Sequence, residues 1–285
     1  FYIKLIFGVE MKILGVIPVR WSSSRFPGKP LVDICGKTMI EHVYRRVSRS
    51  KMIDNIIVAT DDKRIFDEVK NFGGSVKMTS SVHESGTDRV AEIANRPESE
   101  DFSIIVNIQG DEPFVDPVSI DAAIKMMLDN QNIDIVTLAV KITSSKDLVD
   151  PDIVKVVFDR NMKALFFSRA PIPFVRDLMS SDKSYNVMKS SSEEMVDNFF
   201  KHLGLYVYQK KILDRFSKLP KATIEEQESL EQLRALDDGM NIMIVKTAMD
   251  SVGIDSPEDL ERIFEDEKKK AAIQEEIASW QNISS

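Results

Sequence analysis

The amino-acid sequence predicts an α/β fold: one domain with a mostly parallel central sheet flanked by helices, plus a small β-hairpin subdomain. Two patterns predict it. In the first half of the chain, short apolar runs rich in β-branched residues alternate with segments of helical periodicity, which is typical of a parallel sheet wrapped by helices. In the second half, two apolar runs flank a polar turn, which indicates a hairpin.

The elements of the first half follow from apolar spacing. Apolar runs predict strands over residues 13–19, 55–59, 75–78 and 103–109. Helical periodicity covers residues 38–50, 63–72 and 87–95. Gly73 and Gly74 are a fitting stop for the second helix, and Thr87 with Asp88 is expected to open the third. Ligands of such sheets bind beyond the carboxyl ends of the strands, so polar residues there are the candidate functional residues.

The second half is expected to hold the hairpin, further strands and two helices. The hairpin strands are residues 153–158 and 164–168, joined through a polar turn. The remaining strands cover 202–208 and 241–246, and the helices cover 225–236 and 257–270. Ser256 is the expected N-cap of the last helix. Residues 177–197 are rich in Ser, Asp and Lys and predict a loop.

Composition excludes several classes of function. The 285 residues carry a net charge of −8, whereas a general nucleic-acid binder needs a basic face. A single cysteine, Cys35, allows no intrachain disulfide and favours a cytoplasmic location. No apolar run has the length that membrane insertion requires. We interpret residues 1–10 as an upstream extension, because the segment from Met11 has the character of a fresh start, and residues 11–285 as the domain.

The strongest functional signal is the loop from Arg20 to Lys29, directly after the first predicted strand. Arg20, Arg25 and Lys29 supply three cations, and the Ser, Gly and Pro residues between them can present hydroxyl and backbone N–H donors to one polyanion. The pattern is not a Walker A motif. A solvated basic loop is the alternative, and the position at the end of a strand favours phosphate binding over it.

Two acidic residues are candidate metal ligands. Asp111 follows an apolar strand within the segment QGDEP, where a carboxylate suits Mg²⁺, which prefers oxygen ligands and also binds substrate phosphates. Asp255 lies between a strand and a capped helix. Taken singly, each has a structural alternative: Asp111 as a turn residue before proline, and Asp255 as a helix-capping residue.

The combination of motifs is more specific than any one of them. The sequence resembles the sugar-acid cytidylyltransferases, and most of all the 3-deoxy-manno-octulosonate (Kdo) cytidylyltransferases, or CMP-Kdo synthetases. The matching segments follow the family order between residue 13 and about residue 262. They are IPVRWSSSRFPGKPL, ATDD, SGTDR, VNIQGDEP, VKVVFD, ALFFSRAPIP, KHLGLYVY, SLEQLRAL and GIDSPEDLE.

The resemblance implies roles on the nucleotide side. The loop residues that match the triphosphate site of CTP are Arg20, Ser22, Ser23, Ser24, Arg25 and Lys29. The other implied nucleotide-binding residues are Thr60, Asp61, Ser85, Gly86, Thr87, Arg89 and Gln109. Asp111 and Asp255 match the two carboxylates that bind Mg²⁺, the implied cofactor. Arg20, Lys29, Asp111 and Asp255 form the implied catalytic set.

The resemblance also implies an acceptor pocket. The matching residues are Arg169, His202, Tyr206, Glu231 and Gln232. Each has a structural alternative: Tyr206 as core, His202 as a satisfied strand-end histidine, and the helix residues as solvent-facing. We interpret His42 and His83 as structural. Departures from the family pattern near the acceptor side leave 8-amino-Kdo open as an acceptor beside Kdo.

The implied reaction transfers CMP from CTP to the anomeric hydroxyl of Kdo and releases pyrophosphate, for lipopolysaccharide biosynthesis. Positioning and charge stabilisation should dominate it. The resemblance further implies a homodimer, with residues 141–215 as a dimerisation and sugar-binding subregion.

Three alternatives to the Kdo enzyme remain. A sialic acid enzyme shares the chemistry, but the segments HLGLY and LEQLRAL favour the Kdo branch. A nucleotide-sugar-dependent glycosyltransferase would carry a DxD motif, where this chain has Gly-Asp-Glu. A non-catalytic binding protein of the same fold is disfavoured by the intact basic loop and acidic pair.

Overall fold

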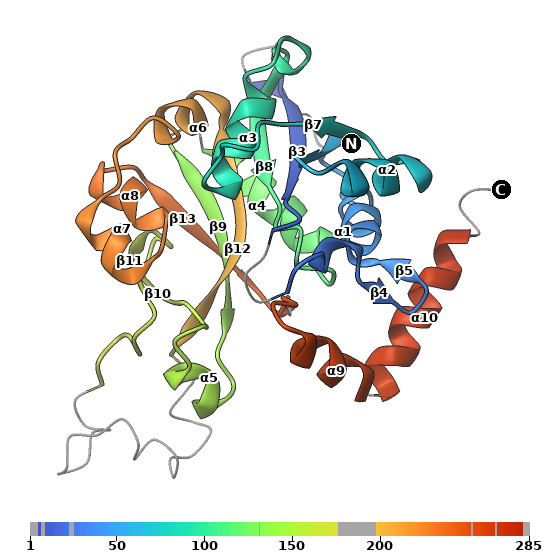
Figure 1. Ribbon diagram of the computed structural model, residues 1–285. Coiled ribbons are helices and arrows are strands. Elements are labelled where there is room, and N and C mark those ends of the chain that lie inside the picture. The colour runs from blue at the N-terminus through green and yellow to red at the C-terminus, as the bar shows by residue number, and fades with distance from the viewer. Residues whose placement is uncertain are drawn as a thin grey trace. The chain divides into compact units, whose positions relative to one another are not determined.

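The computed structural model describes residues 5–6, 9–22, 26–130, 132–175, 198–251, 253–265 and 267–281. The chain divides into two compact units, Phe1–Asp121 with Ser251–Ser285, and Ala122–Asp250 (Figure 1). The predicted loop at 177–197 lies outside the described residues. No helix in the described part of the chain combines the length and apolarity needed to cross a bilayer.

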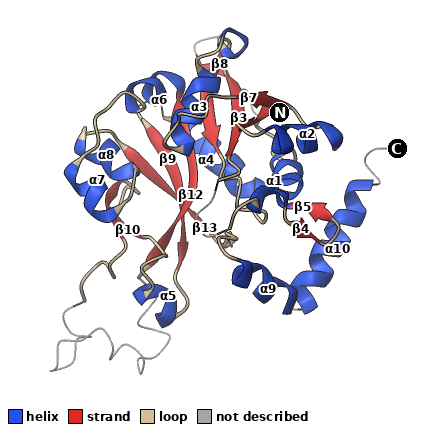
Figure 2. Ribbon diagram, viewed as in Figure 1, coloured by secondary structure: helices blue, strands red, loops and turns tan. Residues whose placement is uncertain are grey.

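The first unit contributes four parallel strands in the order β8-β3-β6-β7 (Figure 2). They are β3 (Lys12–Val19), β6 (Asn55–Thr60), β7 (Val76–Met78) and β8 (Phe102–Asn107). All four match predicted strands. Seven of the eight residues of the inner strand β3 are buried, which explains why its sequence is continuously apolar.

Helices connect these strands. They are α1 (Met39–Val47), α2 (Lys63–Asn71), α3 (Gly86–Ala94) and the start of α4 (Pro117–Asp129). Short elements are β1 (Leu5–Ile6) paired with β2 (Val9–Glu10), the 3₁₀ turns η1 (Lys29–Leu31) and η2 (Pro97–Ser99), and the hairpin β4 (Asp33–Ile34) with β5 (Lys37–Thr38).

The start of α3 differs from the prediction. Ser85, and not Thr87 or Asp88, is the N-cap. Its hydroxyl accepts a hydrogen bond from the backbone N–H of Asp88 at 3.1 Å, and the Asp88 carboxylate accepts one from the N–H of Ser85 at 3.2 Å. This reciprocal pair is a capping box, which satisfies two backbone donors at once.

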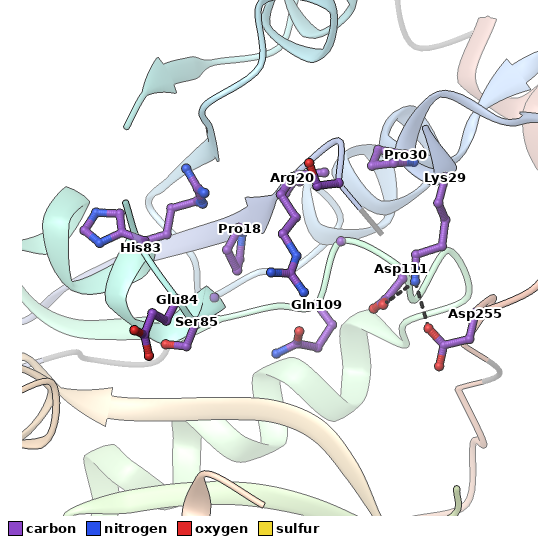
Figure 3. Close-up of a pocket in the computed structure, with 15 residues that line it drawn as sticks. Pro18, Arg20, Lys29, Pro30, His83, Glu84, Ser85, Gln109, Asp111 and Asp255 are labelled. Carbon is purple, nitrogen blue, oxygen red and sulfur yellow. Dashed lines mark hydrogen bonds and ion pairs between the residues drawn. The ribbon is translucent and has the colours of Figure 1, made fainter. Parts of the chain in front are cut away.

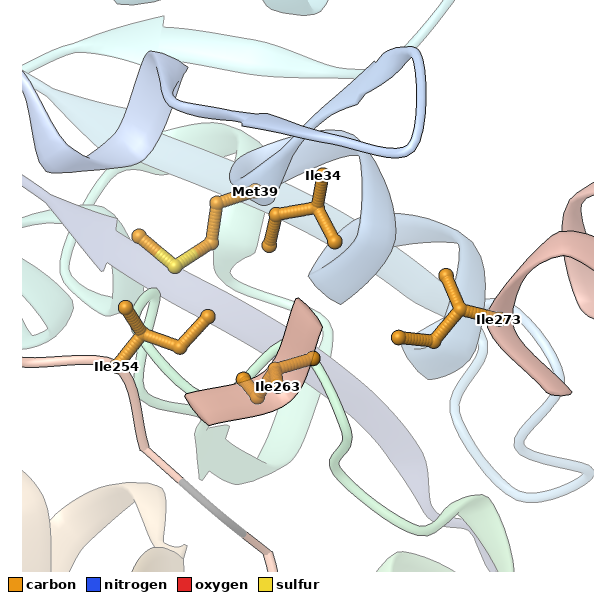
Figure 4. Packing of buried hydrophobic residues seen from close by; sticks show 5 residues of the cluster. All are labelled: Ile34, Met39, Ile254, Ile263 and Ile273. Carbon is orange, nitrogen blue, oxygen red and sulfur yellow. The ribbon is translucent and has the colours of Figure 1, made fainter. Parts of the chain in front are cut away.

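The C-terminal helices return to the first unit. These are α9 (Pro257–Glu265) and α10 (Glu267–Gln281). One helix was predicted over 257–270, and α9 begins at the predicted residue. Ser256 donates its hydroxyl to Asp259 and accepts from the Asp259 N–H, as its predicted capping role requires. Ile254, Ile263 and Ile273 pack with Ile34 of β4 and Met39 of α1 in one buried cluster (Figure 4).

The second unit contains the predicted hairpin within a mostly antiparallel group of strands. The strands are β9 (Ile135–Lys141), β10 (Lys155–Phe158), β11 (Ala164–Ser168), β12 (Phe200–Gln209) and β13 (Ile242–Thr247). β10 pairs antiparallel with both β11 and β12, β12 pairs antiparallel with β9, and β13 pairs parallel with β9. β9 is not among the predicted strands.

The helices of the second unit correct one prediction. They are α5 (Ser145–Val149), α6 (Lys210–Phe216), α7 (Thr223–Glu228) and α8 (Gln232–Asp237). The continuous helix predicted over 225–236 is wrong, because Ser229 has a φ of 52° and ends α7 in a left-handed conformation. A buried ion pair between Glu225 and Arg234 joins the two short helices.

The predicted α/β class, with a mostly parallel sheet, flanking helices and a small hairpin, is confirmed. The predicted domain boundaries and the role given to residues 141–215 stay predictions.

Candidate functional site

A pocket of about 330 Å³ lies in the first unit, beyond the carboxyl ends of β3 and β8 (Figure 3). Nine of the residues that the sequence singled out line it. They are Arg20, Ser22, Lys29, Ser85, Gly86, Arg89, Gln109, Asp111 and Asp255. Ser23, Ser24 and Arg25 lie outside the described residues.

Parallel strand pairing brings these residues together. Val19 is in register with Thr60, and Val16 with Asn107, so the segments after β3, β6 and β8 emerge at one edge of the sheet. The glycine that precedes Asp111 permits a close approach of two of these segments. A Cβ on Gly110 would lie 2.9 Å from Val19 Cγ2 and 3.1 Å from the backbone oxygen of Pro18.

The basic loop is closed by Trp21. Its backbone oxygen accepts a hydrogen bond from Gly28 N at 3.1 Å, and its ring lies where a side chain on Gly28 would be, 2.8 Å from an ideal Cβ. Gly28 also has a φ of 76°, which favours glycine. The Arg64 guanidinium stacks over the indole at 3.3 Å from the ring centroid. Both ends of the loop are thereby fixed, which places Arg20 and Lys29 in one pocket.

The Lys29 ammonium lies between the two predicted metal ligands. Its Nζ is 2.7 Å from Asp111 Oδ2 and 2.8 Å from Asp255 Oδ1, and the residue is only 8% exposed. Burial by itself lowers the pKa of Lys29, but the two carboxylates outweigh it and hold that pKa above its ordinary value. We refer to these three side chains as the acidic–lysine triad.

Backbone contacts hold Asp255 beside Asp111. The N–H of Ile254 donates to the backbone oxygen of Asp111 at 3.0 Å. The N–H of Asp255 itself donates to Asp259 Oδ2 at 3.0 Å, which ties the residue to the start of α9. Ile254 is fully buried in the cluster of Figure 4, so hydrophobic packing fixes the segment that carries this carboxylate.

Asp111 and Asp255 are suited to hold Mg²⁺. Since both contact one ammonium nitrogen, their oxygens lie no farther apart than the sum of those two contact distances. No group of three or more potential metal-ligating His, Cys, Asp or Glu side chains occurs in the described part of the chain. Mg²⁺, however, usually takes only one or two protein carboxylates and completes its shell with water and phosphate oxygens, so the pair fits this metal.

Three predicted nucleotide-binding residues, Thr60, Asp61 and Thr87, do not line the pocket themselves. Thr60 and Thr87 are buried, and Asp61 holds Arg89 through an ion pair of 3.1 Å. Arg89 is itself 3% exposed and also donates to Thr79 Oγ1 and to the backbone oxygen of Ser80.

Sequence interpretation missed His83 and Glu84, which also line the pocket. His83 was interpreted as structural, and its Nε2 does hold Glu92 Oε2 at 2.6 Å, yet the residue also lines the cavity. The sequence signal that could have identified His83 is its position two residues before Ser85. His42 has the structural role expected of it: it is buried, and its Nε2 bonds the backbone oxygen of Ile34 at 2.8 Å.

In the second unit, Arg169 is held by backbone oxygens. Its Nε donates to Glu228 O and its Nη1 to Pro151 O, both at 2.8 Å, and its Nη2 donates to Ser229 O at 3.4 Å. The Glu228 carboxylate also accepts from the backbone N–H of Arg169 at 2.9 Å. A guanidinium has five N–H donors, so these contacts with described residues leave two for a ligand.

His202 packs against the strand that leads to Arg169. Its ring lies edge-on to Phe167 of β11, with the centroids 5.0 Å apart. His202 Nε2 is 2.8 Å from the hydroxyl of Thr137, and burial lowers the pKa of His202 well below its ordinary value. Tyr206 is the next ring along β12, 5.4 Å from His202.

Glu231 and Gln232 open α8, which packs against β11. Gln232 is buried, contrary to the solvent-facing alternative. The five predicted acceptor residues therefore lie on β12, at the end of β11 and at the start of the helix packed against it.

Comparison with known proteins decides the family. A family model for cytidylyltransferases matches residues 14–242. The chain is 46% identical over 256 residues to the 3-deoxy-manno-octulosonate cytidylyltransferase of Geobacter sulfurreducens, covering 90% of this chain and 99% of that protein. It is 48% identical over 252 residues to the protein of the same name from Solibacter usitatus, covering 88% and 93%. The chain belongs to the 3-deoxy-manno-octulosonate cytidylyltransferase family.

Two solved structures have a similar fold, and the first of them also carries the family's name. A structure described as CMP:2-keto-3-deoxy-manno-octonic acid synthetase complexed with CTP superposes with a TM-score of 0.79 at 37% identity, covering 93% of this chain and 99% of that one. A cytidylyltransferase from Leptospira borgpetersenii, with a TM-score of 0.56, 19% identity and 96% coverage of both chains, shares the fold.

The cytidylyltransferase family model ends at residue 242, before Asp255. The assignment of Asp255 to the candidate site therefore rests on its contact with Lys29. Removing the ammonium tests this geometry. In Lys29→Met, without divalent metal, two neighbouring carboxylates lose their common cation, and we expect a loss of about 1–2 kcal/mol in the free energy of unfolding. The measurement is denaturant unfolding in EDTA.

Lys63→Met is the matched control, because Lys63 makes an exposed ion pair with Asp67, and such pairs contribute little. The double variant Lys29→Met/Asp255→Asn should regain part of the loss, because it removes one of the two repelling charges. Equal stability of Lys29→Met and wild type would show that the triad contributes nothing to the metal-free fold.

Proposed function

We propose that this chain transfers CMP from CTP to the anomeric 2-hydroxyl of Kdo and releases pyrophosphate. The observation that carries the proposal is the acidic–lysine triad at one end of a pocket that Ser85, Gly86 and Arg89 of the SGTDR segment also line. The family relatives named above are cytidylyltransferases for this sugar acid, and the solved neighbour holds CTP.

The phosphate end of the pocket explains the chemistry. The oxygen of the acceptor hydroxyl forms a bond to the α-phosphorus as the bond to the bridging oxygen of pyrophosphate breaks, and the hydroxyl proton is lost. Mg²⁺ bound by Asp111 and Asp255 would stabilise charge on the phosphates. Arg20 and Lys29 line the same pocket, where their cations favour the charge that develops on the leaving pyrophosphate.

Lys29 then has two successive partners. In the structure it neutralises the Asp111 and Asp255 carboxylates. If these carboxylates hold Mg²⁺, the Lys29 ammonium would turn to the triphosphate as its anionic partner, because a buried cation needs one. The Trp21–Gly28 contact limits how far the loop can shift, so the side chain and not the backbone makes this change.

The second unit offers hydrogen-bond donors and acceptors suited to a sugar acid. The two remaining N–H groups of Arg169 can clamp a carboxylate. The buried Gln232 amide has no hydrogen bond to another described residue and can serve a sugar hydroxyl. The Thr137 hydroxyl lies 2.7 Å from the backbone oxygen of Leu205, so it donates there and accepts from His202 Nε2. That tautomer leaves Nδ1 of His202 as an acceptor.

Location and assembly stay proposals. We propose a cytoplasmic homodimer that uses the β10–β11 hairpin, supported by the 58% exposure of Leu165 on the outer strand β11, since exposed apolar surface on a strand edge favours a partner. Light scattering at micromolar concentration tests it, and a monomer would contradict it.

Pyrophosphate release from CTP with a panel of acceptors tests the function. We expect turnover with Kdo in the presence of Mg²⁺, and comparison of kcat/KM with 8-amino-Kdo decides between these two eight-carbon acceptors. Turnover with a nine-carbon sialic acid alone would keep the cytidylyltransferase chemistry and reject the Kdo assignment. Hydrolysis or transfer from a nucleotide sugar, without pyrophosphate, would indicate a glycosyltransferase.

Neutralising either acidic residue tests the metal site. Asp111→Asn and Asp255→Asn should each lower kcat by about 10²-fold or more, since each removes half of the protein charge that holds Mg²⁺. The control is Asp101→Asn, an exposed carboxylate paired with Lys12. Near-normal kcat at limiting Mg²⁺ would exclude the substituted residue as a ligand.

Arg169 is the residue by which we expect the enzyme to bind the acid group. Arg169→Lys keeps a cation but loses the fork, and should raise KM for Kdo about 10-fold or more, with little change in KM for CTP. Arg160→Lys, exposed in the hairpin turn, is the control. A larger effect on CTP than on Kdo would place Arg169 outside the acceptor pocket.

A further inference from the structure

His83 lies at the end of the pocket opposite the acidic–lysine triad. Figure 3 shows His83, Glu84 and Ser85 at one end, Lys29, Asp111 and Asp255 at the other, and Arg20 with Gln109 between them. A nucleotide whose phosphates reach the basic loop and the triad must direct its nucleoside toward the other end. His83 is thus placed beside the ribose or the base.

The orientation of the His83 ring follows from one hydrogen bond. Nε2 is 2.6 Å from Glu92 Oε2, and an ionised carboxylate can only accept, so Nε2 carries a proton. His83 lines the pocket and Glu92 does not, so the histidine links the pocket wall to the Glu92 carboxylate. In the neutral ring, Nδ1 is then an acceptor, and it has no partner among the described residues.

Glu92 is itself held in place as an anion. It accepts from the backbone N–H of Ser80 at 2.9 Å and from the Arg96 guanidinium. Burial by itself raises the pKa of Glu92, but the hydrogen bonds from Ser80, Arg96 and His83 outweigh it and lower the pKa to about 2. The carboxylate therefore fixes both the tautomer and the direction of the His83 ring.

We propose that His83 is a specificity-determining residue, whose Nδ1 accepts a hydrogen bond from a donor on the nucleoside part of the substrate. The inference rests on the proposed use of CTP. Two donors on cytidine have the required chemistry, the exocyclic amino group of the base and a ribose hydroxyl. An acceptor at this position disfavours uracil, because uracil presents a carbonyl oxygen where cytosine presents the amino group.

The experiment compares kcat/KM for CTP, UTP, 2′-deoxy-CTP and 3′-deoxy-CTP, with a saturating acceptor, in wild type and in His83→Ala. Loss of one hydrogen bond made by only one of two competing substrates should lower their ratio roughly 5- to 10-fold. A fall in the CTP:UTP ratio assigns the bond to the amino group. A fall in the ratio of CTP to one deoxy substrate assigns it to that hydroxyl.

His83→Asn provides a rescue, because its amide oxygen can lie near the position of Nδ1, and it should recover part of the lost ratio. Val82→Ala is the matched control on the same loop, since Val82 is 81% exposed and does not line the pocket. A purely structural histidine would change all four substrates equally, so unchanged ratios in His83→Ala would overturn the proposal. Failure of the wild type to use any of the four nucleotides would instead reject the proposed function.

Discussion

The contact of the Lys29 ammonium with the carboxylates of Asp111 and Asp255 is the interaction on which the candidate site of the first unit depends. The two carboxylates belong to residues 82 and 226 positions away from Lys29 in sequence. Without a cation between them, two carboxylates at this separation would repel each other. The ammonium holds the pair in a geometry that one divalent metal ion can take over, so the metal-free protein keeps the shape of the site.

Much of the fold could be predicted because local patterns are strong where they agree with the final packing. The apolar run of β3 is buried nearly throughout, and the Gly73-Gly74 stop follows α2 directly. The α3 cap was placed too late because Thr87-Asp88 is itself a plausible cap, whereas the structure uses the Ser85–Asp88 spacing of a capping box. The bounds of helix α4 were not predicted, although Asp116 caps it from just before Pro117, a typical start signal.

The candidate site was predicted as a set of residues, but its internal geometry could not be. Sequence assigned Lys29 to phosphate and the two aspartates to metal, and nothing local indicates that the three side chains meet. The backbone oxygens around Arg169 come from Pro151, 18 residues before it, and from Glu228, 59 residues after it, a pairing that only tertiary structure creates. The break at Ser229 carries no Gly or Pro signal. His83 belongs to no spacing pattern, and its role becomes visible only through Glu92 and the shape of the pocket.

The first unit is discontinuous in sequence, since Phe1–Asp121 is completed by Ser251–Ser285 only after the whole of Ala122–Asp250. A ribosome therefore synthesises all of the second unit before it adds Ile254 and Asp255. Closing this long interval carries a loop entropy that grows only slowly with length, but contacts so distant in sequence slow folding. The nascent chain can form the strands of the first unit early and cannot complete the acidic–lysine triad until Asp255 has emerged from the ribosome.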